Sequence, residues 1–279
     1  MRIYHVETIL SPFLVVEPYN HNNKLQLNKR IMTYCVALKL NAGMVFASDS
    51  RTNAGLDQIS SFKKMRHFFN RDDRTLIILS SGNLSVTQNA INLLEQRSLQ
   101  QEIRNIWNVN SLFDVASLLG DCLREVRDRE SVFLSQSNID SSVNFIVGGQ
   151  IKNEAMRLFL IYAEGNFIEV SEENPFFQIG ETKYGKPIID RVITPQTPIS
   201  DAVKCILVSF DSTMRSNLSV GFPIDLVCYK NNSLDLDFQH LTQDDPYFIQ
   251  ISRCWGEGLR NVFASLPNPH WLKELPPPF

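Results

Sequence analysis

The sequence has little excess of charge of either sign and no long apolar run. Lys and Arg number 27 against 30 Asp and Glu, which leaves a formal net charge of −3 over 279 residues. The basic residues are scattered and are not interleaved with aromatic ones, so no nucleic-acid surface is indicated. No apolar stretch reaches the ~18 residues that a membrane-spanning helix needs. We therefore expect neither nucleic acid nor a membrane as a partner.

Cysteine and histidine are also scarce, with five residues of each type. The cysteines form no CxxC pair and have wide, irregular spacings at Cys35, Cys122, Cys205, Cys228 and Cys254. This pattern favours neither a disulfide framework nor a zinc site. We expect no metal, no organic cofactor and a reduced, cytoplasmic location.

Residues 1–31 differ in character from the rest of the chain. Their apolar run, 9–16, is short and has neither a strongly basic flank nor a small-residue cleavage site, so a signal peptide is not expected. Two interpretations stay open: a removable leader, or upstream sequence included because the start was assigned too early, since Met32-Thr33 is itself a plausible start. We expect residues 1–32 to be absent from the mature protein. Residues 33–279 would form one domain with an extension after about residue 231.

Blocks of strands and helices alternate from residue 33 onward. Apolar and β-branched runs predict strands at 33–40, 44–50, 64–69, 74–81, 142–149, 156–163, 167–170 and 224–230. Helical spacing and capping residues predict helices at 83–98, at 111–130, near 184 and from about 200. This order is typical of a layered α+β domain rather than a βαβ repeat. Two sheets between pairs of helices would explain strands that are apolar on both faces.

The first two strands bring a hydroxyl and a carboxylate together. We place their turn on residues 41–43, with the glycine at a positive φ. Centring the turn there pairs Thr33 with Arg51 and Cys35 with Asp49, so that all four side chains share one face. Diagonal neighbours on such a face lie roughly 7–8 Å apart, within reach of side chains or of one water. Cys35 is interpreted as a small buried residue rather than as a nucleophile.

A chain that begins at Thr33 carries a free α-amino group beside the threonine hydroxyl. The ordinary pKa of that amine is ~7.7–8.0, and its neutral form can accept the hydroxyl proton and so activate the nucleophile. A nearby lysine would favour the neutral amine, and a carboxylate would hold the lysine in place. Lys63 and Lys64 are both candidates for this lysine. Only one of them can approach Thr33, because adjacent strand residues point to opposite faces. The strand-to-helix junction at Gly82 offers N–H donors for an oxyanion.

Six segments in combination resemble proteasome β subunits, and among these the bacterial Anbu (ancestral β subunit) family. They are 33–37 (TYCVA), 46–55 (FASDSRTNAG), 62–65 (FKKM), 81–83 (SGN), 184–187 (YGKP) and 211–221 (DSTMRSNLSVG). The resemblance runs from Thr33 to about Lys230. It implies a four-layer αββα N-terminal-nucleophile (Ntn) hydrolase sandwich that hydrolyses peptide bonds within a ring-like homo-oligomer.

The resemblance also implies roles for individual residues. Thr33 corresponds to the nucleophile and, through its amine, to the base, with Asp49 and Lys64 as the supporting pair. Gly82 corresponds to the oxyanion donor, and Ser219 to a serine that supports the terminal amine. Arg51 and Asn53 correspond to residues that line the extended peptide substrate in the family. The implied substrate is a peptide or an unfolded protein, and the need for an ATPase partner stays open.

Three positions depart from the family pattern. Ser216 stands where the family has a supporting aspartate, and Glu181 or a neighbour replaces a family serine. Met32, rather than glycine, precedes Thr33, which leaves autocatalytic processing open and favours removal of an initiator methionine. Two alternatives to the peptidase therefore remain: a catalytically weak or inactive scaffold of the same fold, and an amidase acting on small substrates.

Overall fold

The computed structural model describes residues 33–53 and 59–271, and the statements below concern these residues. The chain divides into two units, residues 1–30 and 31–279, of which the first lies entirely outside the described residues. Our expectation of a leader or misassigned start at 1–32 therefore also falls outside them.

Two five-stranded antiparallel sheets form the centre of the second unit. The first sheet has the order β10-β1-β2-β11-β12. Its strands are β10 (Phe176–Gly180), β1 (Tyr34–Leu40), β2 (Gly43–Asp49), β11 (Ile224–Lys230) and β12 (Leu236–Leu241). The second sheet has the order β5-β6-β7-β8-β9. Its strands are β5 (Met65–Asn70), β6 (Arg74–Gly82), β7 (Val143–Ile151), β8 (Arg157–Ile161) and β9 (Phe167–Glu169).

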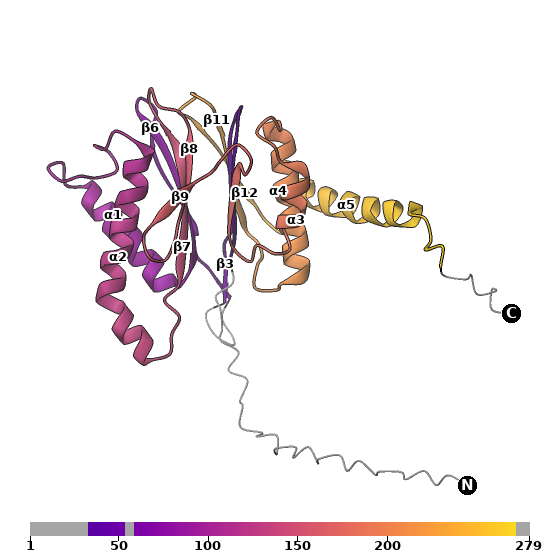
Figure 1. Cartoon of the computed structure of the whole chain (residues 1–279), viewed down its shortest axis with the longest axis horizontal. Helices are drawn as coiled ribbons and strands as arrows, with labels where there is room; N and C mark the ends of the chain where they lie inside the picture. The colour runs from indigo at the N-terminus through magenta and orange to yellow at the C-terminus, as the bar shows by residue number, and fades with distance from the viewer. Residues whose placement is uncertain (1–32, 54–58, 272–279) are drawn as a thin grey trace, which may run out of the picture. The chain divides into compact units, whose positions relative to one another are not determined.

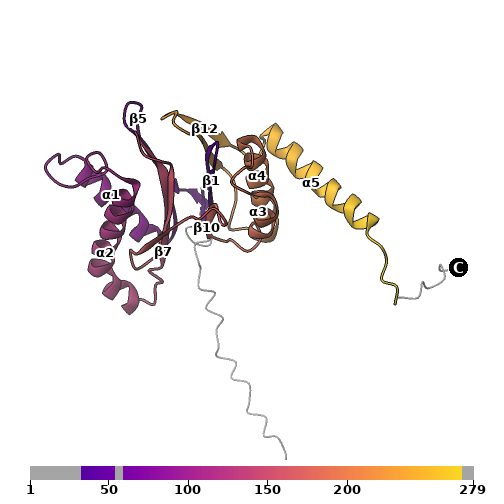
Figure 2. The same cartoon turned by 45° about the horizontal axis from the view of Figure 1, so that its top comes forward.

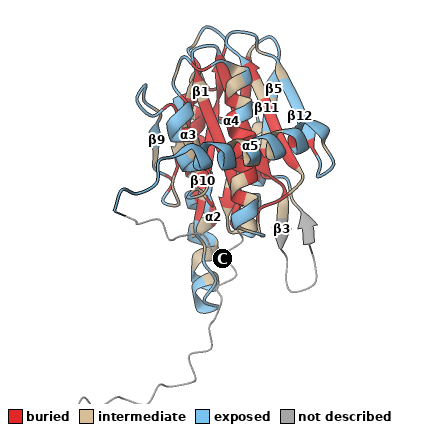
Figure 3. Cartoon of the chain, turned by 90° about the vertical axis from the view of Figure 1, so that its right-hand side faces the viewer, coloured by how far each residue is buried: buried red, intermediate tan, exposed pale blue. Residues whose placement is uncertain are grey.

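Helices cover the outer face of each sheet (Figure 1). The pair α1 (Leu84–Ser98) and α2 (Leu112–Gln136) packs on the second sheet through one apolar cluster. The pair α3 (Lys186–Val192) and α4 (Ile199–Ser216) packs on the first sheet through another. A third cluster, which includes Phe46, fills the space between the sheets. The expected α+β, αββα sandwich is thus confirmed, with both faces of the central strands buried (Figure 3).

The helices begin where the sequence indicates, because side chains satisfy their first N–H groups. Asn83 accepts hydrogen bonds from the backbone N–H groups of Ser85 and Val86 at the start of α1. Ser111 accepts from Asp114 N at the start of α2, and its hydroxyl donates back to the Asp114 carboxylate. The α2 helix extends to Gln136, six residues beyond the expected end at 130.

Several elements were not expected from the sequence. β10 lies beside β1 (Figure 2), and the short hairpin of β3 (Arg51–Asn53) and β4 (Ile59–Ser61) follows β2. Beyond residue 231, β12 forms an edge strand, and α5 (Pro246–Ser265) packs against α4. The helical pattern of α5 is weakened by two interior glycines, Gly256 and Gly258, since glycine disfavours helix.

The expected register of the first hairpin was wrong by one residue. Leu40 pairs with Gly43, so the turn contains two residues rather than three, and Cys35 pairs with Ser48 rather than with Asp49. The glycine is required by close packing, since a Cβ on Gly43 would lie 2.0 Å from the carbonyl oxygen of Tyr229 in β11. Our expectation that Cys35 and Asp49 share a face fails with that register.

Gly43→Ala is expected to destabilise the protein by about 1–3 kcal/mol, because the new methyl group would force β2 away from β11. Gly258→Ala is the matched control, because nothing lies within 4 Å of a Cβ at that helical position. It should be neutral or stabilise the protein by up to about 1 kcal/mol. Urea unfolding of both variants measures the difference, and equal midpoints would contradict this account of Gly43.

Candidate functional site

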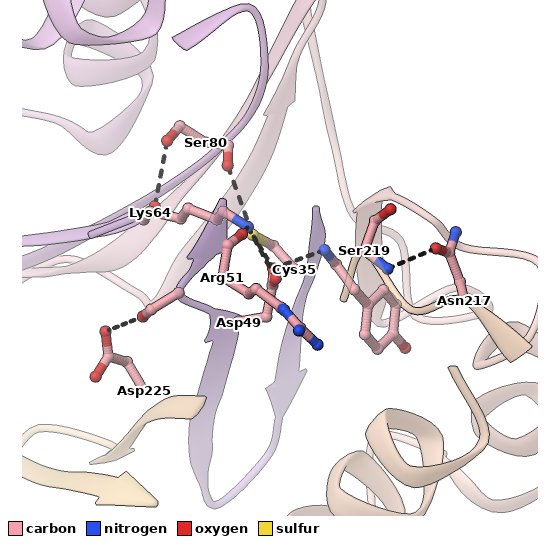
Figure 4. Close-up of polar contacts among 10 residues, drawn as sticks. Cys35, Asp49, Arg51, Lys64, Ser80, Asn217, Ser219 and Asp225 are labelled. Carbon is pink, nitrogen blue, oxygen red and sulfur yellow. Dashed lines mark hydrogen bonds and ion pairs between the residues drawn. The ribbon is translucent and has the colours of Figure 1, made fainter. Parts of the chain in front are cut away.

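A buried ion pair lies where the two sheets meet. The Lys64 ammonium donates to both carboxylate oxygens of Asp49 at 2.8 Å and to the carbonyl oxygen of Arg51 at 2.7 Å (Figure 4). Asp49 ends β2 in the first sheet, whereas Lys64 directly precedes β5 in the second. The exposed fraction is 0 % for the Asp49 side chain and 5 % for that of Lys64. Lys63 is exposed, so the choice between the two lysines falls on Lys64.

Asp49 also joins this pair to the start of β1. Its Oδ1 accepts a hydrogen bond of 2.9 Å from the backbone N–H of Tyr34, the residue directly after Thr33. Complete burial raises the pKa of Asp49 above its usual value, while the Lys64 ammonium and the N–H groups of Tyr34 and Gly221 oppose that rise. One carboxylate therefore connects the lysine to the segment that carries Thr33.

Thr33 is itself buried and is held through its carbonyl group. The backbone N–H of Glu181 donates to Thr33 O at 2.6 Å. Gly180 adopts φ +84°, and a Cβ there would lie 1.8 Å from the same oxygen, so this position requires glycine. β10, absent from our expectations, thereby fixes the position of Thr33.

Glu181 also connects with the turn that follows α4. Its Oε2 accepts a hydrogen bond of 2.9 Å from Asn217 Nδ2, and Asn217 Oδ1 accepts one of 2.9 Å from the backbone N–H of Ser219. Figure 4 shows Ser219 and Asn217 beside the ion pair. Ser216 is exposed at the end of α4. The sequence did not single out Asn217, although it lies within the 211–221 segment.

A second buried carboxylate holds the backbone between the two acceptors of Lys64. Asp225 Oδ2 accepts from the Ser50 hydroxyl at 3.1 Å, and Asp225 Oδ1 lies 2.6 Å from His240 Nδ1. Ser50 N–H donates to the carbonyl oxygen of Pro223 at 2.9 Å. Ser50 stands between Asp49 and Arg51, so these contacts position both acceptors. Asp225 and His240 were missed because their pairing depends on β12.

Gly82 ends β6 directly before the first turn of α1. Its φ is +106°, and a Cβ there would lie 2.1 Å from the carbonyl oxygen of Ser142. Two residues earlier, Ser80 O accepts from Cys35 Sγ at 3.6 Å, and Ser80 N–H donates to Lys64 O at 2.9 Å. The strand that ends at Gly82 thus contacts both β1 and the segment of Lys64.

The remaining expected residues are Arg51 and Asn53, both in β3, and Cys35 in β1. The Arg51 guanidinium packs on Gly221, where a Cβ would lie 3.0 Å from its Nη1. Asn53 is in β3, and its side chain lies outside what the structure describes. Burial raises the pKa of Cys35 far above the usual value of a thiol, which agrees with a packing role and disfavours a thiolate.

Neither a metal cluster nor a membrane-spanning helix occurs in the described part of the chain. Across residues 33–53 and 59–271, no three His, Cys, Asp or Glu side chains are grouped so that they could hold a metal ion. Within the same ranges, no helix is long and apolar enough to cross a membrane.

The family model described as "Proteasome subunit" matches residues 32–228. The chain belongs to the proteasome subunit family. Within this family it is similar to Anbu proteins, as its sequence motifs predict. The Anbu structure from Yersinia bercovieri is 50% identical, with a TM-score of 0.81 over 86% of this chain and 100% of that chain.

Two other Anbu structures match to a similar extent. That from Pseudomonas aeruginosa is 47% identical, with a TM-score of 0.82 over 86% of this chain and 99% of that one. That from Hyphomicrobium sp. strain MC1 is 43% identical, with a TM-score of 0.79 over 85% of this chain and 99% of that one. Comparison with functionally curated proteins gives no match. The three Anbu structures confirm the resemblance to Anbu that the sequence motifs indicate.

Replacing Lys64 in this Anbu-type subunit by methionine is expected to cost about 3–5 kcal/mol of folding free energy, because Asp49 would stay buried without its cation. Lys186→Met is the matched control. Its ion pair with Asp190 has side chains 53% and 44% exposed, so its loss should cost no more than about 0.5 kcal/mol. Urea unfolding measures both, and a small effect of Lys64→Met would contradict the role of the pair.

Proposed function

We propose that this proteasome subunit is a threonine peptidase in which Thr33, once it is the first residue, is the nucleophile. The observation that carries the proposal is the Asp49 carboxylate, which accepts hydrogen bonds from both Lys64 and the backbone N–H of Tyr34. Through Tyr34, the residue after Thr33, this contact supports a role of the Lys64 charge in keeping the Thr33 amine neutral. A nearby cation disfavours a second positive charge and so lowers the pKa of that amine.

The reaction needs only groups of this chain, a peptide and water. The neutral Thr33 amine takes the hydroxyl proton while Oγ1 attacks the peptide carbonyl carbon, and the oxyanion that forms accepts a hydrogen bond from the Gly82 N–H. The amine then gives its proton to the leaving nitrogen as the C–N bond breaks, which leaves an ester on Thr33. Water, deprotonated by the same amine, hydrolyses that ester and frees the hydroxyl.

Three further residues have supporting roles in this proposal. Ser219 would support the terminal amine, and a chain of contacts favours this role: Ser219 N–H donates to Asn217, Asn217 donates to Glu181, and Glu181 N–H donates to Thr33 O. Arg51 and Asn53, in β3, would bind the backbone of an extended substrate. Whether Glu181 or a neighbour stands in place of the family serine, the backbone N–H of Glu181 donates to Thr33 O.

The decisive test uses a protein that begins at Thr33. Incubation with a peptide epoxyketone should add one inhibitor per chain, because this reagent reacts with a hydroxyl and a free amine on the same residue. Thr33→Ser should retain the adduct, whereas Thr33→Ala and a protein in which Met32 is retained should show none. Intact-mass spectrometry measures the adduct.

The two alternatives give different results in this test. A folded protein with the correct terminus that never reacts would contradict the peptidase and favour a scaffold of the same fold. Turnover confined to small amides, with no peptide cleaved in a profiling library, would favour the amidase. Intact mass of the protein from its native host would identify the first residue, and cell fractionation would test the expected cytoplasmic location.

The subunit is also proposed to act as a homo-oligomer. The structure from Pseudomonas aeruginosa is described as a helical assembly of the Anbu complex. In this chain the last turns of α5 expose an apolar stripe at helical spacing, formed by Leu259, Val262 and Phe263, and the exposed Leu266 directly after the helix extends it. An apolar stripe of this kind on a soluble domain indicates a protein contact, and a second copy of the chain is the occupant proposed.

Phe263→Glu is expected to shift the protein from its assembly to smaller species, because a charge would have to be buried in the contact. Phe263 is 77% exposed, so the substitution should leave the fold of the single chain unchanged. Asn261→Glu, an exposed polar position on the same helix, is the matched control and should keep the assembly. Analytical ultracentrifugation measures both, and equal profiles would exclude α5 as the contact.

A further inference from the structure

A basic pocket lies between β5, β6 and α1, next to the ion pair. It has a volume of about 260 Å³, and Lys64 and Ser80 form the wall nearest the site. The opposite wall is one face of α1, which includes Leu84 and Gln88. Lys63 and Arg66 complete the set of basic side chains around it. No role in the reaction has so far been assigned to this pocket.

The pocket is adjacent to the reacting groups on two sides. The Lys64 side chain lines the pocket, while its ammonium reaches Asp49. Ser80 is two residues before Gly82 on β6, and Leu84 is two residues after it. A peptide whose carbonyl oxygen lies at the Gly82 N–H therefore has the side chain of that same residue next to the pocket.

The charges around the pocket are positive and partly uncompensated. Asp49 neutralises Lys64, but neither Lys63 nor Arg66 has an ion-pair partner among residues 33–53 and 59–271. Arg66 is half-buried and points to the same face of its strand as Lys64, two residues away. Among the described residues the lining contains no Asp or Glu. The first turn of α1 holds no acidic residue, so the positive end of that helix dipole is not offset.

We propose that this pocket binds the acidic side chain, Glu or Asp, of the substrate residue whose carbonyl is attacked. Arg66 is the specificity-determining residue, because a guanidinium binds a carboxylate through two parallel hydrogen bonds. Lys63 adds a second positive charge at the exposed rim. The inference rests on the proposed function for the position of the carbonyl, and it adds the class of substrate.

The first measurement compares four fluorogenic peptides. They differ only in the residue whose carbonyl is attacked, which is Glu, Gln, Leu or Lys. With the protein that begins at Thr33, kcat/KM for the Glu peptide should exceed that for the Gln peptide roughly ten- to hundredfold, as expected for hydrogen bonds to a charged group. The preference should weaken as salt is raised. Equal values for Glu and Gln, or a preference for Leu or Lys, would overturn the proposal.

Variants of Arg66 test whether this side chain is the cause. Arg66→Gln should remove the difference between the Glu and Gln peptides, and Arg66→Glu should favour the Lys peptide. Arg71→Glu is the matched control, because Arg71 lies at the far end of the same hairpin and pairs with Asp235 on the surface. It should keep the Glu preference, and a Glu preference that persists in Arg66→Gln would overturn the assignment.

A binding experiment separates this inference from the proposed reaction. Acetylated tripeptides that end in Glu or Gln are titrated by calorimetry into the Thr33→Ala variant, which cannot form an ester. The Glu peptide should bind roughly tenfold or more tightly, and Arg66→Gln should abolish the difference. Selective binding without any turnover in the unsubstituted protein would contradict the peptidase but support the pocket. Equal affinities for the Glu and Gln peptides would overturn the proposed role of the pocket, whether or not the unsubstituted protein cleaves peptides.

Discussion

The interior ion pair between Lys64 and Asp49 is the constraint on which the site depends. Each charge would be costly in an apolar interior if it stood alone, so the two sheets must keep both partners in contact. The first sheet supplies the carboxylate and the second supplies the ammonium. Any sliding of one sheet over the other would separate them, and the packing between the sheets therefore also fixes the geometry of the site.

The other contacts around Thr33 follow from this arrangement. Asp49 of β2 holds the N–H of Tyr34, Glu181 directly after β10 holds the carbonyl of Thr33, and Ser80 of β6 accepts from Cys35. These bonds come from three separate segments of the chain, and together they fix the first residues of β1. The position of Thr33 is thus set mainly by backbone groups, whose places are fixed by the sheets.

Much of this could be predicted from the sequence, and the failures have identifiable causes. Hydrophobic periodicity and caps located α1, α2 and α4 and most of the central strands, because these elements are buried on regular faces. The turn was placed one residue off because Gly43 was interpreted as a turn residue. The glycine is in fact required by the close contact with Tyr229, and the sequence alone does not distinguish the two causes. β12 is largely exposed, so its apolar pattern is weak, and α5 was missed because its two interior glycines disfavour a helix.

In the candidate site, too, some residues could be predicted from the sequence and others could not. Motif segments indicated Asp49 and Lys64 as the pair, and the two groups are in contact in the structure. Asp225 and His240 could not be paired without knowing that β12 returns beside β11. Asn217 and Glu181 are 36 residues apart, and only the fold brings them together. Local patterns therefore identify partners close to one hairpin, while contacts between distant elements need the three-dimensional structure.

The contact between β10 and Thr33 has a consequence for how this protein can vary. Position 181 binds the threonine through its backbone N–H, which every residue except proline possesses, whereas Gly180 before it cannot gain a side chain without striking the Thr33 carbonyl. A change of side chain at 181 would therefore keep the backbone bond to Thr33, although it would remove the carboxylate that accepts from Asn217. A side chain at 180 would break the Thr33 contact itself, so the backbone support of the threonine tolerates substitution at one of these two neighbours only.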